Sequence, residues 1–170
     1  MRVEPKQLKA FLLDAGLITD KQFETVLKKA DKTGQKVGDV LVSEGLITQE
    51  KLIQLEAYIL GISFINLEKE IISPEVLKII PEPIARSHNI VAFRKTGNNL
   101  EVAMIDPEDL RTIEFIKKTT PSLKILPRLT TSESIKRILR QYQQSLEAEF
   151  GEIIKKEAGV IRSIKDEEIV

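Results

Sequence analysis

Residues 12–19 read Leu-Leu-Asp-Ala-Gly-Leu-Ile-Thr, and residues 41–48 read Leu-Val-Ser-Glu-Gly-Leu-Ile-Thr. The two stretches lie 29 residues apart, and each ends in Gly-Leu-Ile-Thr before an amphipathic segment. A repeat at fixed spacing indicates a duplicated structural unit that buries its apolar face against its neighbour. We therefore predict an all-helical tandem module of two helix-turn-helix units over residues 1–61.

Each copy carries the signals that begin and end short helices. In the first copy, Gly16 ends one helix, because glycine readily adopts the left-handed conformation found at helix C-termini. Thr19 or Asp20 then caps a second helix, which we expect to end in a turn at residues 31–34. The second copy repeats this plan, with Gly45 in the place of Gly16.

The pattern changes after residue 61. A short strand is predicted over residues 62–67, and two further strands over 90–94 and 100–105. The Thr-Gly-Asn-Asn sequence at 96–99 joins these two as a hairpin, because its residues tolerate positive φ. Residues 123–126 form another predicted strand. Together with intervening helices, this pattern predicts an α+β fold: the helical module followed by a small three-to-four-strand sheet packed with helices.

Three segments complete the predicted organisation. Asp106 resembles the N-cap of a helix with Pro107 at its first position, and a long final helix is expected to begin near residues 131–134. We assign residues 62–145 to the α+β domain. Residues 146–170 carry charged and apolar residues without a dense apolar stripe, so we expect a linker or tail, helical or frayed, with little core of its own.

The composition argues against several functional classes. Lys+Arg and Asp+Glu both number 26, so the chain has no net charge that would favour nucleic acid or an anionic membrane. No run of about 18 apolar residues is present, which argues against direct membrane insertion. The absence of cysteine excludes disulfides and thiolate metal sites. A cytoplasmic location is the expectation.

Catalytic motifs are also missing from the sequence. The Gly-Gln-Lys-Val-Gly stretch at residues 34–38 has the wrong spacing for a phosphate-binding loop. His88 is the only histidine, which makes a catalytic triad or a histidine metal site improbable. Glu108 and Asp109 are interpreted as acids that complement a helix dipole. We therefore expect a non-enzymatic chain that needs no metal or cofactor.

Two motifs in the second module carry a family resemblance. Residues 80–86 read Ile-Pro-Glu-Pro-Ile-Ala-Arg, and residues 100–110 read Leu-Glu-Val-Ala-Met-Ile-Asp-Pro-Glu-Asp-Leu. Over roughly residues 5–145 the chain resembles the N-terminal portion of the bacterial assembly ATPases of type II secretion and type IV pilus systems. The resemblance implies that the acidic stretch near residue 166 approaches a hexameric ATPase core. The chain would then be a truncated piece of such a protein or a natural stand-alone copy.

The same resemblance raises the question of cyclic di-GMP, which the tandem repeat binds in some family members. The family's arginine falls on Gln7 in the first copy and on Lys36 in the second, and its glycine falls on Lys9 and Gly38. An arginine fork meets a guanine edge with two hydrogen bonds, whereas lysine offers only a point charge. The closing glutamine is also replaced in both copies, so we expect most of the polar anchors to be lost.

The second copy is the better candidate half-site, because it keeps a cation and the glycine. The aliphatic pairs and the Gly-Leu-Ile corners are retained as well, although helix packing alone would require them. The candidate ligand-binding residues are Lys36, Gly38, Gln7, Leu41 and Gly45.

Two functional hypotheses remain open at this point. The first is a docking and regulatory region that connects the ATPase to the cytoplasmic domain of an inner-membrane platform protein. Such a region would be cytoplasmic and peripheral to the inner membrane through its partners. The second is a cyclic di-GMP sensor with degenerate motifs. A third reading, that the module belongs to another signalling protein sharing the repeat, is also open.

Overall fold

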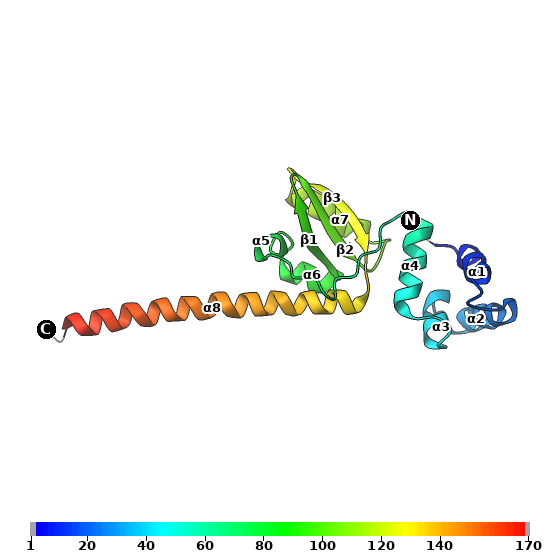
Figure 1. Cartoon of the computed structure of the whole chain (residues 1–170), viewed down its shortest axis with the longest axis horizontal. Helices are drawn as coiled ribbons and strands as arrows, with labels where there is room; N and C mark the ends of the chain where they lie inside the picture. Colours follow the sequence, from blue (N-terminus) through cyan, green and yellow to red (C-terminus); the bar gives the residue numbers. More distant parts are fainter. Residues whose placement is uncertain (1–2, 169–170) are drawn as a thin grey trace.

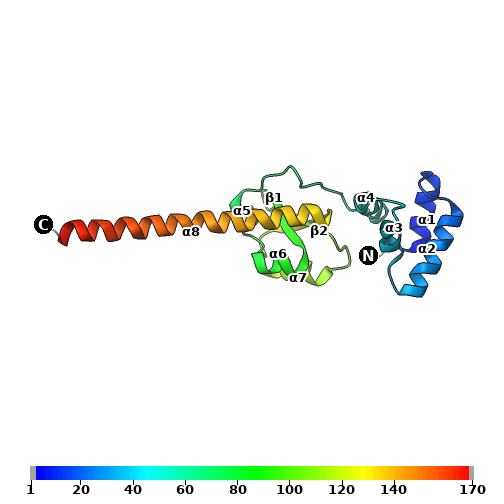
Figure 2. The ribbon, with the colours of Figure 1, turned by 90° about the horizontal axis from the view of Figure 1, so that it is seen from below.

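The computed structural model describes residues 3–168, except for the side chains of residues 149 and 160–168. Figures 1 and 2 show a helical module at one end, a small sheet module in the middle, and one long helix projecting from the other end. The helical module consists of α1 (Pro5–Asp14), α2 (Asp20–Thr33), α3 (Val37–Ser43) and α4 (Gln49–Leu60). The predicted tandem pair of helical hairpins is thus present.

The second module has three strands and four helices in the described part of the chain. In chain order these are α5 (Pro74–Leu77), α6 (Glu82–His88), β1 (Ile90–Thr96), β2 (Asn99–Met104), α7 (Leu110–Thr119), β3 (Lys124–Leu129) and α8 (Ser132–Glu168). The sheet order is β1-β2-β3, with β1 antiparallel and β3 parallel to β2. Helix α7 makes the crossover between the parallel strands, as parallel pairing requires. The predicted α+β class is therefore confirmed.

Local capping interactions explain the helix boundaries of the first module. The Thr19 hydroxyl accepts a hydrogen bond from the Gln22 backbone N–H at 3.2 Å, so Thr19 is the N-cap of α2. Helix α2 then continues to Thr33 and ends at Gly34, which has φ +72°. The predicted turn at residues 31–34 is therefore too early, because the backbone stays helical as far as Gly34, whose N–H donates to the Ala30 carbonyl at 2.9 Å.

Helix α4 belongs to the cores of both modules. Leu52 packs with the buried side chains of α1–α3, while its neighbour Ile53 and also Ala57 pack with those of the sheet module. Gln49 Nε2 also donates to Ser132 Oγ at 3.0 Å across the boundary. Because adjacent positions on a helix point about 100° apart, one helix supplies two apolar faces. The two modules are joined by packing as well as by the chain.

The predicted strand over residues 62–67 is not formed. Only Phe64 makes a bridge, opposite Leu129, where the Ile65 N–H donates to the Leu129 carbonyl at 2.9 Å. Strand β3 ends at this point, and the Leu67 N–H donates instead to the Ser134 hydroxyl on α8 at 3.1 Å. The apolar residues of this segment are extended but have almost no strand to pair with.

The predicted helix start at Asp106 is also wrong. Helix α7 begins at Leu110, because the Asp109 carboxylate accepts from both the backbone N–H and the hydroxyl of Thr112. The Asp106 carboxylate accepts from the Glu108 N–H at 2.9 Å, which holds residues 106–108 in a turn before the helix. This turn brings two acidic side chains toward the helical module.

Helix α8 continues through the segment that the sequence assigned to a tail. Its first turns pack on α5, α6 and β1, and it then extends to Glu168 beyond the body of the module (Figure 1). In the described part of the chain, no helix is long and apolar enough to cross a membrane.

Candidate ligand cleft between the two modules

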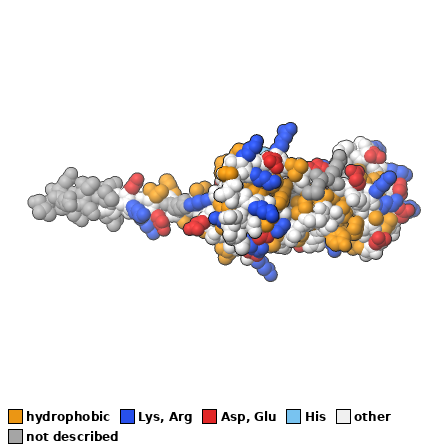
Figure 3. Space-filling view, turned by 90° about the horizontal axis from the view of Figure 1, so that it is seen from above, with side chains coloured by type: hydrophobic (Ala, Val, Ile, Leu, Met, Phe, Trp, Pro, Cys, Tyr) orange, Lys and Arg blue, Asp and Glu red, His pale blue; other side chains and the backbone are white. Residues whose placement is uncertain are grey.

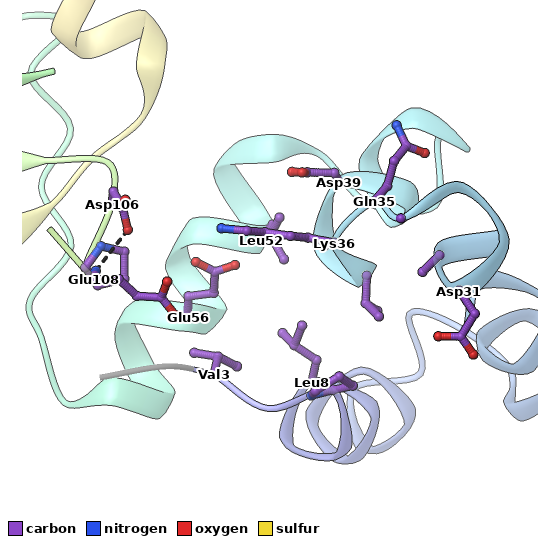
Figure 4. Close-up of a pocket in the computed structure, with 16 residues that line it drawn as sticks. Val3, Leu8, Asp31, Gln35, Lys36, Asp39, Leu52, Glu56, Asp106 and Glu108 are labelled. Carbon is purple, nitrogen blue, oxygen red and sulfur yellow. Dashed lines mark hydrogen bonds between the residues drawn. The ribbon is translucent and has the colours of Figure 1, made fainter. Parts of the chain in front are cut away.

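A cleft of about 420 Å³ lies where α1, α4, the α2–α3 connection and the β2–α7 turn meet. Two of the five candidate ligand residues, Lys36 and Gly38, line this cleft (Figure 4). Its floor is apolar, formed in part by Leu8 and Leu52. Its rim is polar and comes from both modules, so the site exists only because α4 holds them together.

Gly38 has a packing role at the base of the cleft. It is buried in α3, and a Cβ added there would lie 3.0 Å from Leu52 Cδ2. The missing side chain therefore permits the close approach of α3 to α4. Lys36 precedes it as the N-cap residue of α3, with an exposed side chain and no capping hydrogen bond from it.

The charges around the cleft are mainly negative. Lys36 is the only lysine or arginine among the described residues that line it. The carboxylates that line it are Asp31, Asp39, Glu56, Asp106 and Glu108. Figure 4 shows that these acids come from α2, α3, α4 and the β2–α7 turn, so they converge from distant parts of the sequence. Such a cleft attracts cationic groups and repels anionic ones.

Burial and the neighbouring charges of the cleft shift the pKa of Glu56. Burial raises the pKa of the Glu56 carboxyl above its ordinary value, and the carboxylates of Asp39, Asp106 and Glu108 raise it further. Lys36 acts in the opposite direction and lowers the pKa. The balance remains a raised pKa, with burial of the carboxyl as its main cause.

The other three candidate residues lie outside the cleft. The Gln7 side chain accepts from the Glu4 N–H at 2.9 Å and closes a capping box at the start of α1. Leu41 is fully buried in the helical core. Gly45 sits at an exposed corner with φ +73°, a conformation that side chains rarely adopt. Each therefore has a structural role that needs no ligand.

The acidic members of the cleft were not found from the sequence. Glu108 was interpreted as a first-turn helix acid, and Glu56 is one of several polar residues of α4 with no local pattern that marks it. Only the packing of α4 against both modules brings them together. Across the described residues no group of three or more acidic or histidine side chains is placed to hold a metal ion. The cleft lining contains no nucleophile paired with a base.

The raised pKa of Glu56 predicts a pH-dependent stability. The native carboxyl keeps its proton at pH values where the unfolded chain, with an ordinary pKa of about 4.3, has lost it. Stability from this group is therefore lost as the pH rises from that value through the raised one. We expect Glu56→Gln to remove this decline and to raise the melting temperature at neutral pH. Thermal unfolding followed across this range checks it, and Glu50→Gln on the same helix is the control.

The MshEN domain family matches residues 60–149, which is more than half of the chain. The chain belongs to the MshEN domain family. Two curated relatives extend the match: the type IV pilus assembly ATPases PilB of Myxococcus xanthus and of Thermus thermophilus are each 27% identical over 86% of the chain. The chain spans 26% and 16% of the lengths of these two relatives.

Solved structures agree on the fold of this MshEN domain. A structure of MshE with cdg superposes with a TM-score of 0.69 at 24% identity, covering 83% of this chain and 99% of that one. The N-terminal domain of XpsE superposes with a TM-score of 0.58 at 14% identity, covering 82% and 96%. The chain thus corresponds to the N-terminal domains of secretion and pilus ATPases, and not to their ATPase core.

Proposed function

We propose that this MshEN domain is a non-catalytic docking and regulatory region of a type II secretion or type IV pilus assembly ATPase. It links the hexameric motor to the cytoplasmic domain of an inner-membrane platform protein. It is cytoplasmic, and it lies next to the membrane through this partner. The family match and the names of the two PilB relatives support the proposal.

The charge distribution of the cleft favours the docking role over the ligand-sensor alternative. Lys36 is surrounded there by carboxylates from both modules. A cyclic dinucleotide carries two phosphate charges, and proteins bind such groups with arginine, lysine or helix N-termini. A site with five lining carboxylates and one lysine opposes that binding. The tandem hairpins then serve to present surfaces to proteins.

Capture by the platform protein tests the docking role. The immobilised cytoplasmic domain of the platform protein is expected to retain the chain. Phe115, a 47% exposed side chain on α7, supplies a probe on the sheet module, and Leu17, 41% exposed, supplies a matched probe on the helical module. We expect Phe115→Glu to weaken capture and Leu17→Glu to leave it unchanged. Equal retention of the two variants and the parent chain, or no retention of any, contradicts the proposal as stated.

A second candidate function is a cyclic di-GMP sensor. It is favoured by the superposition on MshE with cdg, and by the position of Lys36 and Gly38 in the cleft. Calorimetric titration of the chain with cyclic di-GMP decides between the candidates. We expect no binding heat. The Lys36→Arg variant makes the test more sensitive, because arginine can meet a guanine edge with two hydrogen bonds. Saturable heat that disappears in Lys36→Glu would favour the sensor.

A further inference from the structure

The two ends of the sheet module differ in charge. The end that faces the cleft has the acidic β2–α7 turn described above. At the other end the β1–β2 hairpin, the last turn of α7 and the start of β3 meet. Lys95, Lys118 and Lys124 lie there, one on each of these elements, and all three are exposed. We term these three lysines the basic tip.

The topology of the module brings the three lysines to one end. Strand β2 runs from the hairpin toward the cleft, α7 returns, and β3 starts again at the hairpin because it is parallel to β2. Asn99 is therefore opposite Lys124, and the Lys124 N–H donates to the Asn98 carbonyl at 2.6 Å. Figure 3 views the module from the hairpin side and shows basic side chains spread over it, with apolar ones between them. Three separate segments thus form one surface.

The carboxylates of the neighbouring strand and helix are already paired. Glu101 accepts from Arg94 at 3.0 Å and from Arg128 at 3.2 Å. Glu114 pairs with Lys117 on the same helix, at 3.6 Å. In the described part of the chain, the three lysines of the basic tip form no ion pair. The basic tip is therefore a positive surface on a chain with no net charge.

Phe115 lies beside the basic tip on α7. Its side chain is 47% exposed, and Lys118 follows it by three residues, which places both on the same face of the helix. The helix dipole explains a lysine in the last turn of α7, but it does not explain lysines on two strands. An exposed aromatic side chain bordered by cations has the composition of a protein interface, in which aromatic residues anchor the centre and charges form the rim.

We propose that Phe115 and the basic tip bind an acidic surface of the platform protein's cytoplasmic domain, with an apolar pocket for Phe115. This inference rests on the proposed function and adds the chemistry of the partner. Opposite charges across an interface speed association and disfavour wrong partners. In Figure 1 the hairpin end of the sheet module points away from α8, so a partner bound there does not cover that helix.

An anionic membrane is a weaker occupant of the same surface. Each lysine near such a membrane strengthens binding about fivefold, so three lysines give a factor on the order of a hundred. A single myristoyl chain, with an association constant of about 10⁴ M⁻¹, already gives only marginal binding. The basic tip is therefore too small to hold the chain on lipid by itself, and a protein surface is the occupant that we expect.

Binding kinetics test the role of the charges. The full chain is passed over the immobilised cytoplasmic domain of the platform protein at low and at physiological salt. Rim charges act mainly on the association rate, so we expect the double variant Lys118→Glu with Lys124→Glu to lower that rate by about tenfold at low salt and by less at physiological salt. Phe115→Ala, which changes no charge, is expected instead to raise the dissociation rate, as the loss of a central anchor does.

Two double variants are the matched controls. Lys21→Glu with Lys28→Glu makes the same change in net charge at exposed positions of α2, and it should leave the association rate close to that of the parent chain. Lys118→Arg with Lys124→Arg keeps the charge of the basic tip and should also bind as the parent does. Because all these side chains are exposed, thermal unfolding of the variants should match that of the parent chain.

The outcomes separate this inference from the docking role itself. A parent chain that binds at a rate independent of salt, or equal slowing by the α2 control, would overturn the inference and leave the docking role intact. A parent chain that does not bind at all would overturn both. Phosphatidylglycerol vesicles provide the remaining arm, and we expect them not to retain the chain. Retention by vesicles that is lost in Lys118→Glu with Lys124→Glu would assign the basic tip to the membrane instead.

Discussion

Replacing Leu52 with alanine is expected to destabilise the helical module, whereas replacing its neighbour Ile53 with alanine is expected to destabilise the sheet module. Each substitution should cost about 2–5 kcal/mol, as is usual when a large buried aliphatic side chain is truncated. Both side chains are 6% exposed, so the two positions are matched in burial. They differ in the core that they fill, because Leu52 packs with α1–α3 and Ile53 with the sheet.

Amide hydrogen exchange distinguishes the two effects residue by residue. With Leu52→Ala, protection should fall first in α2 and α3, and with Ile53→Ala it should fall first in β1 and β2. Lys51→Ala, an exposed position on the same helix, is the control and should change neither set. If both variants lower protection everywhere by the same amount, the two modules unfold as one unit. The description of α4 as two separate faces would then be wrong in energetic terms.

Boundaries that depend on nearby residues could be predicted from the sequence, whereas the packing of α4 could not. The start of α2 at the Thr19 cap depends on residues within a few positions of each other, so the local pattern identifies it well. The hairpin at residues 96–99 was likewise identified by residues that tolerate positive φ, and Gly97 does have φ +60°. The packing of Leu52 in one core and of Ile53 in the other could not be predicted in this way. It depends on which module packs on each face, and no local pattern contains that information.

The wrong predictions arose where two candidate helix caps competed, or where a strand-like segment had no neighbouring strand to pair with. Both Asp106 and Asp109 are good helix caps, and the choice fell to Asp109 because Thr112 offers it two donors. The segment over residues 62–67 has the composition of a strand, yet β3 ends too soon to pair with it. The acidic cleft is a further case, because its members come from four separated segments. Only the assembled fold shows that five carboxylates line the cleft together with Lys36.

Removing the hydroxyl of Tyr142 is expected to loosen the contact that fixes α8 to the sheet module. The phenol is buried, and its oxygen lies 2.7 Å from the carbonyl oxygens of both Leu77 and Ile80. A phenol has one proton to donate, so the two carbonyls share it. Tyr142→Phe keeps the ring but leaves both carbonyls without this donor. We expect a loss of about 1–3 kcal/mol, measured by chemical denaturation at neutral pH.

The pH dependence separates this hydrogen bond from simple packing. Burial raises the pKa of the Tyr142 phenol, and the charge of Glu82 raises it further. The native state therefore keeps the proton at pH values above about 10, where an unfolded tyrosine loses it. The parent chain should lose stability as the pH rises through that range, and Tyr142→Phe should lack this component. Because phenylalanine fills the same space, an unchanged alkaline profile in the variant would show that Tyr142 stabilises α8 through its ring alone.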